Sequence, residues 1–431
     1  MMDREEDNHA AIRSPEGTLR GRLRQFGPGI VAVLSMMGAG DLVTASVSGS
    51  SYGYNLMWLL ALSLIVRFVI VNLMGRYQIL NTKGQTIVEG YNDVSKYFPW
   101  FIGIAVLISG HLLNAYMITG AGEALTWIFG IGQPFLWSCV VVLVSLFVIG
   151  RNVYNTIEKL LKLFLVLMTI AFLGLAIYSV PDVGGIVRAT VGFGIPDDTG
   201  TFGVFAVALS LIGAVAGSMA NFLYPYFVKD KGWTGAQYRK VQRNDILFGI
   251  CAAIVINLAV WVVGAELLAP NNIAVGSLED ISKALSLHLG EFGALVFYIG
   301  AFGILYSSVI GFANGFPKVV IDCLHIVKPA RREEFGKKFE DDPWFKWVSL
   351  FILISPVVWS APGMPGFVEM AVFVTGLQAV VVPIVAVGLL ILVNKRSHLG
   401  EHKANVVENV VLFLTTALAI WVSIEVVMGW F

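Results

Sequence analysis

The chain has 431 residues, of which 57% are hydrophobic and only 13% are charged, and its mean hydropathy is +0.77. A soluble domain of ordinary composition carries about 25% charged residues. The composition therefore excludes a soluble globular enzyme and indicates an integral membrane protein. The 29 basic and 29 acidic residues balance to a formal net charge of zero, which excludes a strongly basic protein of the kind that binds nucleic acid.

Apolar segments of about 20 residues, long enough to cross a bilayer, follow one another along the chain. They lie at 29–53, 55–78, 100–128, 134–150, 156–180, 202–228, 243–268, 292–316, 345–362, 367–394 and 406–430. The sequence thus predicts an all-α, multi-pass membrane protein with eleven spans.

The basic residues predict how these spans are oriented, because short cytoplasmic loops are enriched in Lys and Arg. With the N-terminus inside, every Lys and Arg except Arg67, Arg188 and Lys283 falls on the cytoplasmic side. We therefore expect a plasma or inner membrane protein whose N-terminus is cytoplasmic and whose C-terminus is outside.

Eleven spans divide into two groups of five and a final one. Because five is odd, the second group enters the membrane from the opposite side, which predicts inverted repeats. The expected parts are a cytoplasmic tail (1–26), a first repeat (27–180), an extracellular loop (181–201), a second repeat (202–394), and a cytoplasmic loop with the eleventh span (395–431).

Glycines interrupt the first span of each group. The first run, over 35–41, reads SMMGAGD, and the second, over 213–221, reads GAVAGSMAN. Lipid cannot satisfy the backbone groups that a broken helix exposes, so such breaks occur where they line a cavity. Paired breaks at matching positions indicate a transporter site near the bilayer midplane. The carboxylate of Asp41 in the first break favours a cation as the substrate.

Several motifs resemble the NRAMP transporters of divalent metals. They are Gly27-Pro28-Gly29 before the first span, Tyr52 to Trp58 (YGYNLMW) after it, and then Gly75-Arg76, Lys83-Gly84 and Glu89. Gly213-Ala214, at the second break, fits the same pattern. The resemblance covers most of the chain and is strongest over 27–91. It implies a LeuT-type fold of two inverted five-helix repeats plus an eleventh helix, with helices 1 and 6 broken at mid-membrane.

The sequence departs from this family at its metal ligands. Where the family has Asp-Pro-Gly-Asn, this chain has Gly38-Ala39-Gly40-Asp41, and the family's Ala-x-x-Met-Pro-His falls on 214–219. The thioether ligand thus becomes Gly217 and the histidine becomes Met219. The acids of the third span that the family associates with proton movement fall on Asn114 and Met117. This pattern is similar to the NRAMP-related magnesium transporters.

The resemblance and the ligand chemistry together predict a metal site at the two breaks. Carboxylate, carbonyl and water ligands suit Mg²⁺, whereas thioethers favour softer metals. Asp41 would supply the charge, Gly217 would widen the site, and the carbonyls of Gly38 and Ala214 would face the ion or its waters. The carbonyl role of Ala214 follows from the resemblance, and that of Gly38 is our inference. Candidates for the hydration shell are Ser218, Asn221 and Met219.

Simpler roles stay open for the same residues. They are helix capping for Asp41, close packing for Gly38, Gly217 and Met219, and local backbone hydrogen bonding for Ser218 and Asn221. Three other charged or titratable side chains within spans also bear on the site. Structural partners are expected for Arg67 and His111, and Glu123 is a candidate vestibule acid.

The sequence therefore predicts a transporter that imports Mg²⁺, and also Mn²⁺, as a largely hydrated ion by alternating access. Non-titratable residues at Gly38, Asn114, Met117 and Met219 favour transport without proton coupling. The alternatives are a proton-coupled Mn²⁺/Fe²⁺ symporter of the NRAMP type and an organic-substrate permease of the same fold. An enzyme is not expected, because the sequence shows neither a nucleophile–base pair nor a HExxH motif. No cofactor is expected, and a monomer suffices for transport.

Overall fold

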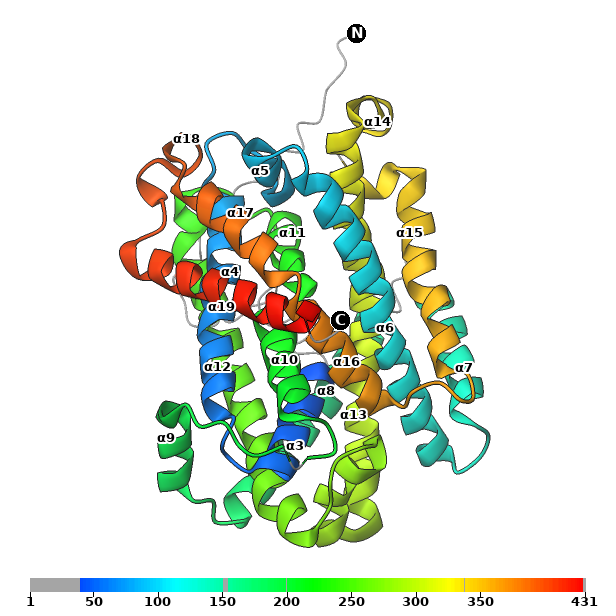
Figure 1. The fold of residues 1–431 in the computed structure, drawn as a ribbon. Helices are drawn as coiled ribbons and strands as arrows, with labels where there is room; N and C mark the ends of the chain where they lie inside the picture. The colour runs from blue at the N-terminus through cyan, green and yellow to red at the C-terminus, as the bar shows by residue number, and fades with distance from the viewer. Residues whose placement is uncertain (1–38, 150–153, 199, 337, 429–431) are drawn as a thin grey trace.

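The computed structural model describes residues 39–149, 154–198, 200–336 and 338–428. The regular elements of this part of the chain are helices (Figure 1). In the first half they are α3 (Ala39–Tyr52), α4 (Met57–Leu80), α5 (Ile87–Val94), α6 (Phe98–Phe129), α7 (Pro134–Val148), α8 (Tyr154–Tyr178) and α9 (Val183–Gly192). The second half begins with α10 (Val204–Val215), the 3₁₀ helix η1 (Met219–Phe222), α11 (Leu223–Asp230), η2 (Ala236–Tyr238), α12 (Arg239–Val263) and the π-helix η3 (Gly264–Leu268), followed by η4 (Ala269–Asn271). It ends with α13 (Leu278–Val327), α14 (Pro329–Phe335), η5 (Phe339–Asp341), α15 (Pro343–Ile354), η6 (Ser355–Ser360), α16 (Phe367–Ala379), α17 (Val382–Asn394), α18 (Arg396–Leu399), η7 (Gly400–His402) and α19 (Val406–Met428).

These helices follow the order of the predicted spans. Seven helical stretches of the described residues are long and apolar enough to cross a membrane, and α8 with α9, which meet at 105°, adds an eighth when counted as one span. The helices α7 and α19 are shorter apolar helices, and the first predicted span is described only from Ala39 onward. The prediction of an all-helical, multi-span membrane protein is confirmed.

Local structure departs from the predicted boundaries in two places. Helix α9 forms inside the segment 181–201, which the sequence predicts to be an extracellular loop. Its N-cap Asp182 accepts a hydrogen bond from the Gly185 amide (2.8 Å), the usual way to start a short helix. Residues 278–289 are helical as well, and α13 continues for 50 residues across a kink at Gly290, where φ is +59°. Glycine tolerates that conformation at little cost.

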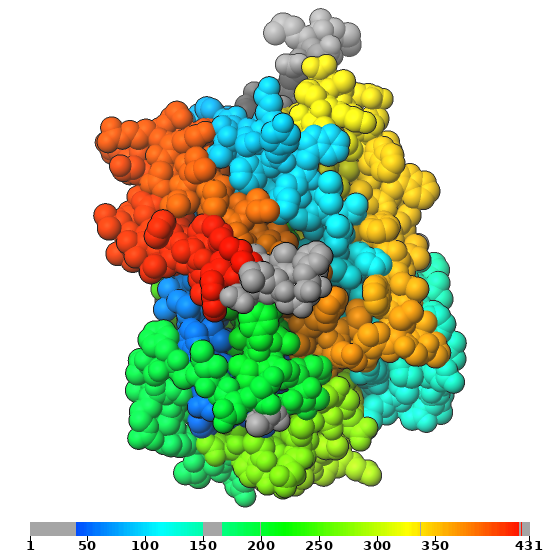
Figure 2. All heavy atoms as spheres, viewed as in Figure 1, coloured from blue at the N-terminus to red at the C-terminus, as the bar shows by residue number. Residues whose placement is uncertain are grey.

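The arrangement of the loops agrees with the charge pattern. The helices α5, α14 and α18, which lie in segments rich in basic residues, gather at one end of the molecule, whereas α9 lies at the opposite end (Figure 1). Which end faces the cytoplasm stays a prediction. Helix α19 runs across α4 and α17 instead of alongside them, and it lies on the surface of the face seen in Figure 2.

Two glycines let the first and seventh predicted spans touch at the backbone. A Cβ at Gly49 of α3 would lie 2.4 Å from the Trp261 carbonyl oxygen of α12, and one at Gly264 of η3 would lie 3.0 Å from the Ser46 carbonyl oxygen. Real Cβ atoms essentially never come as close as 2.4 Å, and a separation of 3.0 Å is tighter than most real Cβ contacts. This contact fixes the position of α3, which carries Asp41.

Candidate metal site

The second predicted break is present in the structure. Helix α10 ends at Val215, and the chain passes through Gly217 and Ser218 into η1 before α11 begins. Ser218 caps η1, since its side chain accepts a hydrogen bond from the Ala220 amide (3.3 Å). Asp41 lies in the first turn of α3, which begins at Ala39. Gly38 falls outside the described residues, so the predicted role of its carbonyl is not tested.

A cavity of about 10 Å³ lies between the start of α3 and the break after α10. Its lining residues are Gly40, Asp41, Leu113, Tyr116, Gly213, Ala214, Ser218, Phe312, Thr375 and Gln378. Three predicted site residues therefore meet there: Asp41, Ala214 and Ser218. A cavity of this size holds about one water, so in this conformation it has no room for a largely hydrated ion.

The remaining predicted residues lie beside the cavity and do not line it. A Cβ at Gly217 would lie 2.6 Å from Val382 Cγ2 and 3.2 Å from the Gln378 carbonyl oxygen. Gly217 thus permits close packing against α16 and α17. Met219 is buried. Asn221 donates to the Ala216 carbonyl (3.1 Å), so it satisfies the backbone freed by the break.

Close approach of two pairs of helices, α10 with α16 and α3 with α6, explains the small size of the cavity. A Cβ at Gly213 would lie 1.8 Å from the Thr375 carbonyl oxygen, and one at Gly40 would lie 2.9 Å from the Tyr116 hydroxyl. Sequence patterns assigned no role to Tyr116 or Thr375. Each is a polar side chain in a long apolar segment, which is a weak indication of a site residue. The sequence does not reveal which neighbouring helix such a side chain faces.

Gln378 of α16 links the break to α6. Its Oε1 accepts a hydrogen bond from the Met219 amide (3.1 Å), and its Nε2 donates to Ser109 Oγ (3.0 Å). The sequence assigns no role to Gln378, because the alignment with the NRAMP family is loose in this span. Its location in an otherwise apolar span was the signal that pointed to it.

Asp41 is paired with Arg67 of α4. The Arg67 Nη1 and Asp41 Oδ2 atoms are 3.2 Å apart, and the two residues are 1% and 4% exposed. The side chain of Asn257 on α12 also lies beside the carboxylate. The structural partner expected for Arg67 is therefore the predicted metal ligand itself.

Other polar groups of the third predicted span are engaged in helix packing. Asn114 donates to the Ile352 carbonyl (2.9 Å), and Met117 is fully buried. His111 accepts a hydrogen bond from Trp359 Nε1 (2.9 Å) and is 2.7 Å from Ser355 Oγ. Glu123 accepts from the Phe367 amide (3.1 Å), at the start of α16. The residues His111, Asn114, Met117 and Glu123 do not line the cavity.

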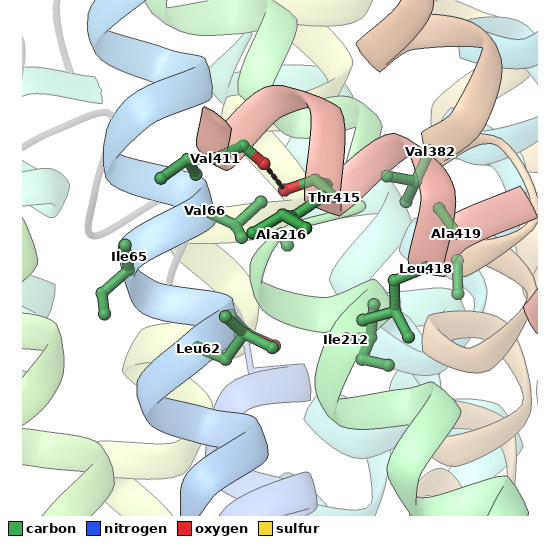
Figure 3. Close-up of a pocket in the computed structure, with 13 residues that line it drawn as sticks. Leu62, Ile65, Val66, Ile212, Ala216, Val382, Val411, Thr415, Leu418 and Ala419 are labelled. Carbon is green, nitrogen blue, oxygen red and sulfur yellow. Dashed lines mark hydrogen bonds between the residues drawn. The ribbon is translucent and has the colours of Figure 1, made fainter. Parts of the chain in front are cut away.

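A second, larger cavity has a different chemistry. It has a volume of about 290 Å³ and lies between α4, α10, α16, α17 and α19. Figure 3 shows Val66, Ile212, Val382 and Leu418 around it. The hydroxyl of Thr415 donates to the Val411 carbonyl (2.7 Å). The described residues that line this cavity carry no charge, so it is an apolar cavity and not an ion site.

The comparison of the sequence with protein families decides the class of the protein. The family model described as "Natural resistance-associated macrophage protein-like" (Nramp) matches residues 29–429. The chain belongs to the Nramp family. It is a multi-pass membrane protein for divalent metal cation transport, and it is not an enzyme.

Individual relatives agree with this assignment. The divalent metal cation transporter MntH of Bacillus subtilis is 27% identical over 309 residues, which cover 69% of this chain and 70% of the relative. MntH of Deinococcus radiodurans is 24% identical over 320 residues, covering 71% of each protein.

Solved structures support the fold. A mutant of the Eremococcus coleocola manganese transporter aligns with a TM-score of 0.75 at 18% identity, over 96% of this chain and 88% of that one. MhsT in complex with L-phenylalanine aligns with a TM-score of 0.56 at 14% identity, over 97% and 100%. The expected NRAMP resemblance and LeuT-type fold are thus confirmed, whereas membership of a magnesium-specific branch stays a prediction.

Proposed function

We propose that this Nramp protein moves a divalent metal cation with hard oxygen ligands, Mg²⁺ first and Mn²⁺ second, by alternating access through the cavity between α3 and α10. The observation that carries the proposal is the chemistry of the lining. Oxygen-bearing residues line the cavity: Asp41 with its carboxylate, Tyr116, Ser218, Thr375 and Gln378, together with Ala214. Among the described residues that line the cavity there is no His, Cys or Met.

Such a donor set suits Mg²⁺. This ion takes octahedral oxygen ligands, keeps several waters and uses one or two carboxylates. A thioether, which favours softer metals, is removed at Gly217, and Met219 lies outside the lining. In our proposal Asp41 is the charged ligand, and Ala214 and Ser218 contact the ion or its waters. Gly38, Gly217, Met219 and Asn221 stay candidates for an open conformation, in which the site is wider.

Manganese is the second candidate substrate, and the relatives favour it. Proteins similar in fold include a manganese transporter, and Mn²⁺ also accepts carboxylate, carbonyl and water ligands. A proton-coupled manganese carrier is therefore the main competing function. A permease for an organic substrate is the third, because MhsT shares the fold.

We further propose that transport is not coupled to protons. Asn114 and Met117 cannot titrate, and His111 and Glu123 are held by partners away from the cavity. Coupling is also not required energetically. A divalent cation that enters across a potential of about 100 mV gains about 4.6 kcal/mol, at roughly 2.3 kcal/mol per charge. Uptake that acidifies the liposome interior in proportion to the metal influx would contradict this part of the proposal.

Ion flux into liposomes that contain the purified protein tests the function. Influx of Mg²⁺, Mn²⁺ and Ca²⁺ is compared for the wild type, Asp41→Ala and a control, Glu123→Gln, whose carboxylate lies away from the cavity. We expect Mg²⁺ influx that is lost in Asp41→Ala and retained in the control. Manganese influx unaffected by excess Mg²⁺ would support the competing carrier, and no metal flux would favour the organic permease.

A further inference from the structure

We infer that Arg67 is an internal counter-cation: it competes with the transported metal for Asp41 and so keeps the metal affinity of the site low. The inference rests on the proposed function, because it concerns the same carboxylate. Three observations carry it: the ion pair itself, the burial of both partners, and the composition of the cavity lining.

The ion pair engages the carboxylate directly. Arg67 Nη1 lies 3.2 Å from Asp41 Oδ2, and the two side chains are almost fully buried. A buried charge that loses its partner is strongly destabilising. The buried Asp41 carboxylate therefore needs a cation, and Arg67 supplies one when no metal is bound.

The two residues have different access to the substrate. Asp41 lines the cavity, whereas Arg67 reaches the carboxylate from α4 and is not part of the lining. A guanidinium carries only hydrogen-bond donors and stays protonated, so it cannot be a metal ligand. Arg67 acts on the metal solely through Asp41, as a specificity-determining residue outside the ligand shell.

The charge of the site follows from this arrangement. Asp41 is the one acidic residue among the described residues of the lining, and Arg67 cancels its charge. A divalent cation thus meets a site of net charge zero with a fixed positive group beside its ligand. Affinity in oxygen-ligand sites depends on the number of charged ligands, so the site is weak. Weak binding suits an abundant ion and disfavours capture of a scarce one.

The exchange also gives Asp41 a cation in both halves of the transport cycle. Arg67 pairs with the carboxylate when the metal has left, and the metal displaces the guanidinium when it binds. The empty carrier can then reorient with its buried carboxylate paired. An unpaired carboxylate inside the membrane would raise the energy of this step and slow the return of the carrier.

Direct metal binding to the full-length protein in detergent tests the inference, with Mg²⁺ and Mn²⁺ each titrated alone. For Arg67→Gln, which removes the charge, we expect binding about tenfold tighter or more. Arg67→Lys keeps the charge and is expected to stay near the wild-type affinity. The control Arg188→Gln removes an exposed arginine in α9 that pairs with Asp182, and its affinity is expected not to change. In flux assays, Arg67→Gln is expected to have a lower KM and a lower maximal rate, because the metal is released more slowly.

An unstable variant still gives a result. If Arg67→Gln unfolds without metal, it is purified in Mg²⁺ and its melting temperature is followed as the Mg²⁺ concentration is varied. Because ligand binding stabilises the folded state by mass action, the inference expects stabilisation that saturates at lower Mg²⁺ than in the wild type. A variant that stays unfolded at every Mg²⁺ concentration would show that Arg67 is purely structural.

The outcomes separate this inference from the proposed function. If the wild type transports Mg²⁺ or Mn²⁺ but Arg67→Gln binds the metal equally or more weakly, the role of Arg67 is wrong and the function stands. If neither the wild type nor Arg67→Gln binds or transports either metal, the proposed function fails, and the inference fails with it.

Discussion

Gln378 accepts a hydrogen bond from the backbone amide of Met219, with 3.1 Å between its Oε1 and the amide nitrogen. The break after α10 removes the helical partner of that amide. A side chain from α16 therefore supplies the hydrogen bond that the broken helix cannot make, at a depth where lipid offers none. The same side chain donates to Ser109 of α6, so one residue holds three helices around the cavity.

Replacement of Gln378 by Leu should destabilise the protein and reduce transport. The Met219 amide would lose its partner while staying buried, which costs about 1–3 kcal/mol. Melting in detergent and metal flux in liposomes measure the two effects. The exposed Gln237, whose side chain bonds only to the nearby Thr234 carbonyl among the interactions described, gives the control Gln237→Leu. Equal melting temperatures for the two variants would show that the hydrogen bond is unimportant.

The backbone contact at Gly213 should not tolerate a methyl group. In Gly213→Ala the new Cβ would fall 1.8 Å from the Thr375 carbonyl oxygen, so α10 and α16 must separate. Overpacking of this kind typically costs about 1–3 kcal/mol, and we expect less folded protein and reduced flux. Gly174→Ala in α8 is the matched control, because nothing lies within 4 Å of the position that its methyl group would take, and alanine favours a helix. A folded, fully active Gly213→Ala protein would contradict the packing.

The start of α19 should depend on Glu408. Its Oε2 lies 2.8 Å from Arg76 Nη2 of α4, and both side chains are largely buried. Removal of one partner from such a pair costs about 3–5 kcal/mol. We expect Glu408→Ala to lower the melting temperature clearly, and the exposed Glu401→Ala to leave it nearly unchanged. Similar melting of the two variants would mean that Arg76 does not hold α19 in place.

Acid should weaken the start of α15 through Asp342, which lies outside the spans. Burial alone would raise the pKa of Asp342, but hydrogen bonds from Arg331, the Trp344 amide and His325 together lower that pKa below its ordinary value of 3.8. A carboxyl group with a lowered pKa adds stability that is fully present above its unfolded pKa. That stability is lost as the pH falls below about 3.8 through the folded pKa.

The measurement is melting of the wild type and Asp342→Asn from about pH 6 to about pH 3. The wild type should be the more stable protein at pH 6, and the difference should shrink at the acid end. A difference that stays constant over the whole range would rule out ionisation of Asp342 as its cause.

Much of the fold could be predicted because its signals are local. The lengths of the apolar segments indicated the spans, and Gly213 and Gly217 indicated the break after α10. The contacts across the site could not be predicted in the same way. Nothing in the sequence says that Arg67 reaches Asp41, or that Gln378 faces the break, because these pairings depend on how separate helices pack. Gly217 shows the same limit. The sequence shows that Gly217 replaces the family's thioether ligand, but it does not show that Gly217 packs against Val382.

The contact between Gly49 and Gly264 has a consequence for motion. Because the two backbones touch there with no side chains between them, neither helix can slide or rotate past the other without a clash. The C-terminal part of α3 and the end of α12 must therefore travel as one rigid unit when the carrier changes conformation. Rearrangement that opens the cavity has to occur on its other walls, formed by α6, α10, α13 and α16. Labels on α3 and α12 would keep a constant separation through the cycle, whereas labels on α3 and α16 would not.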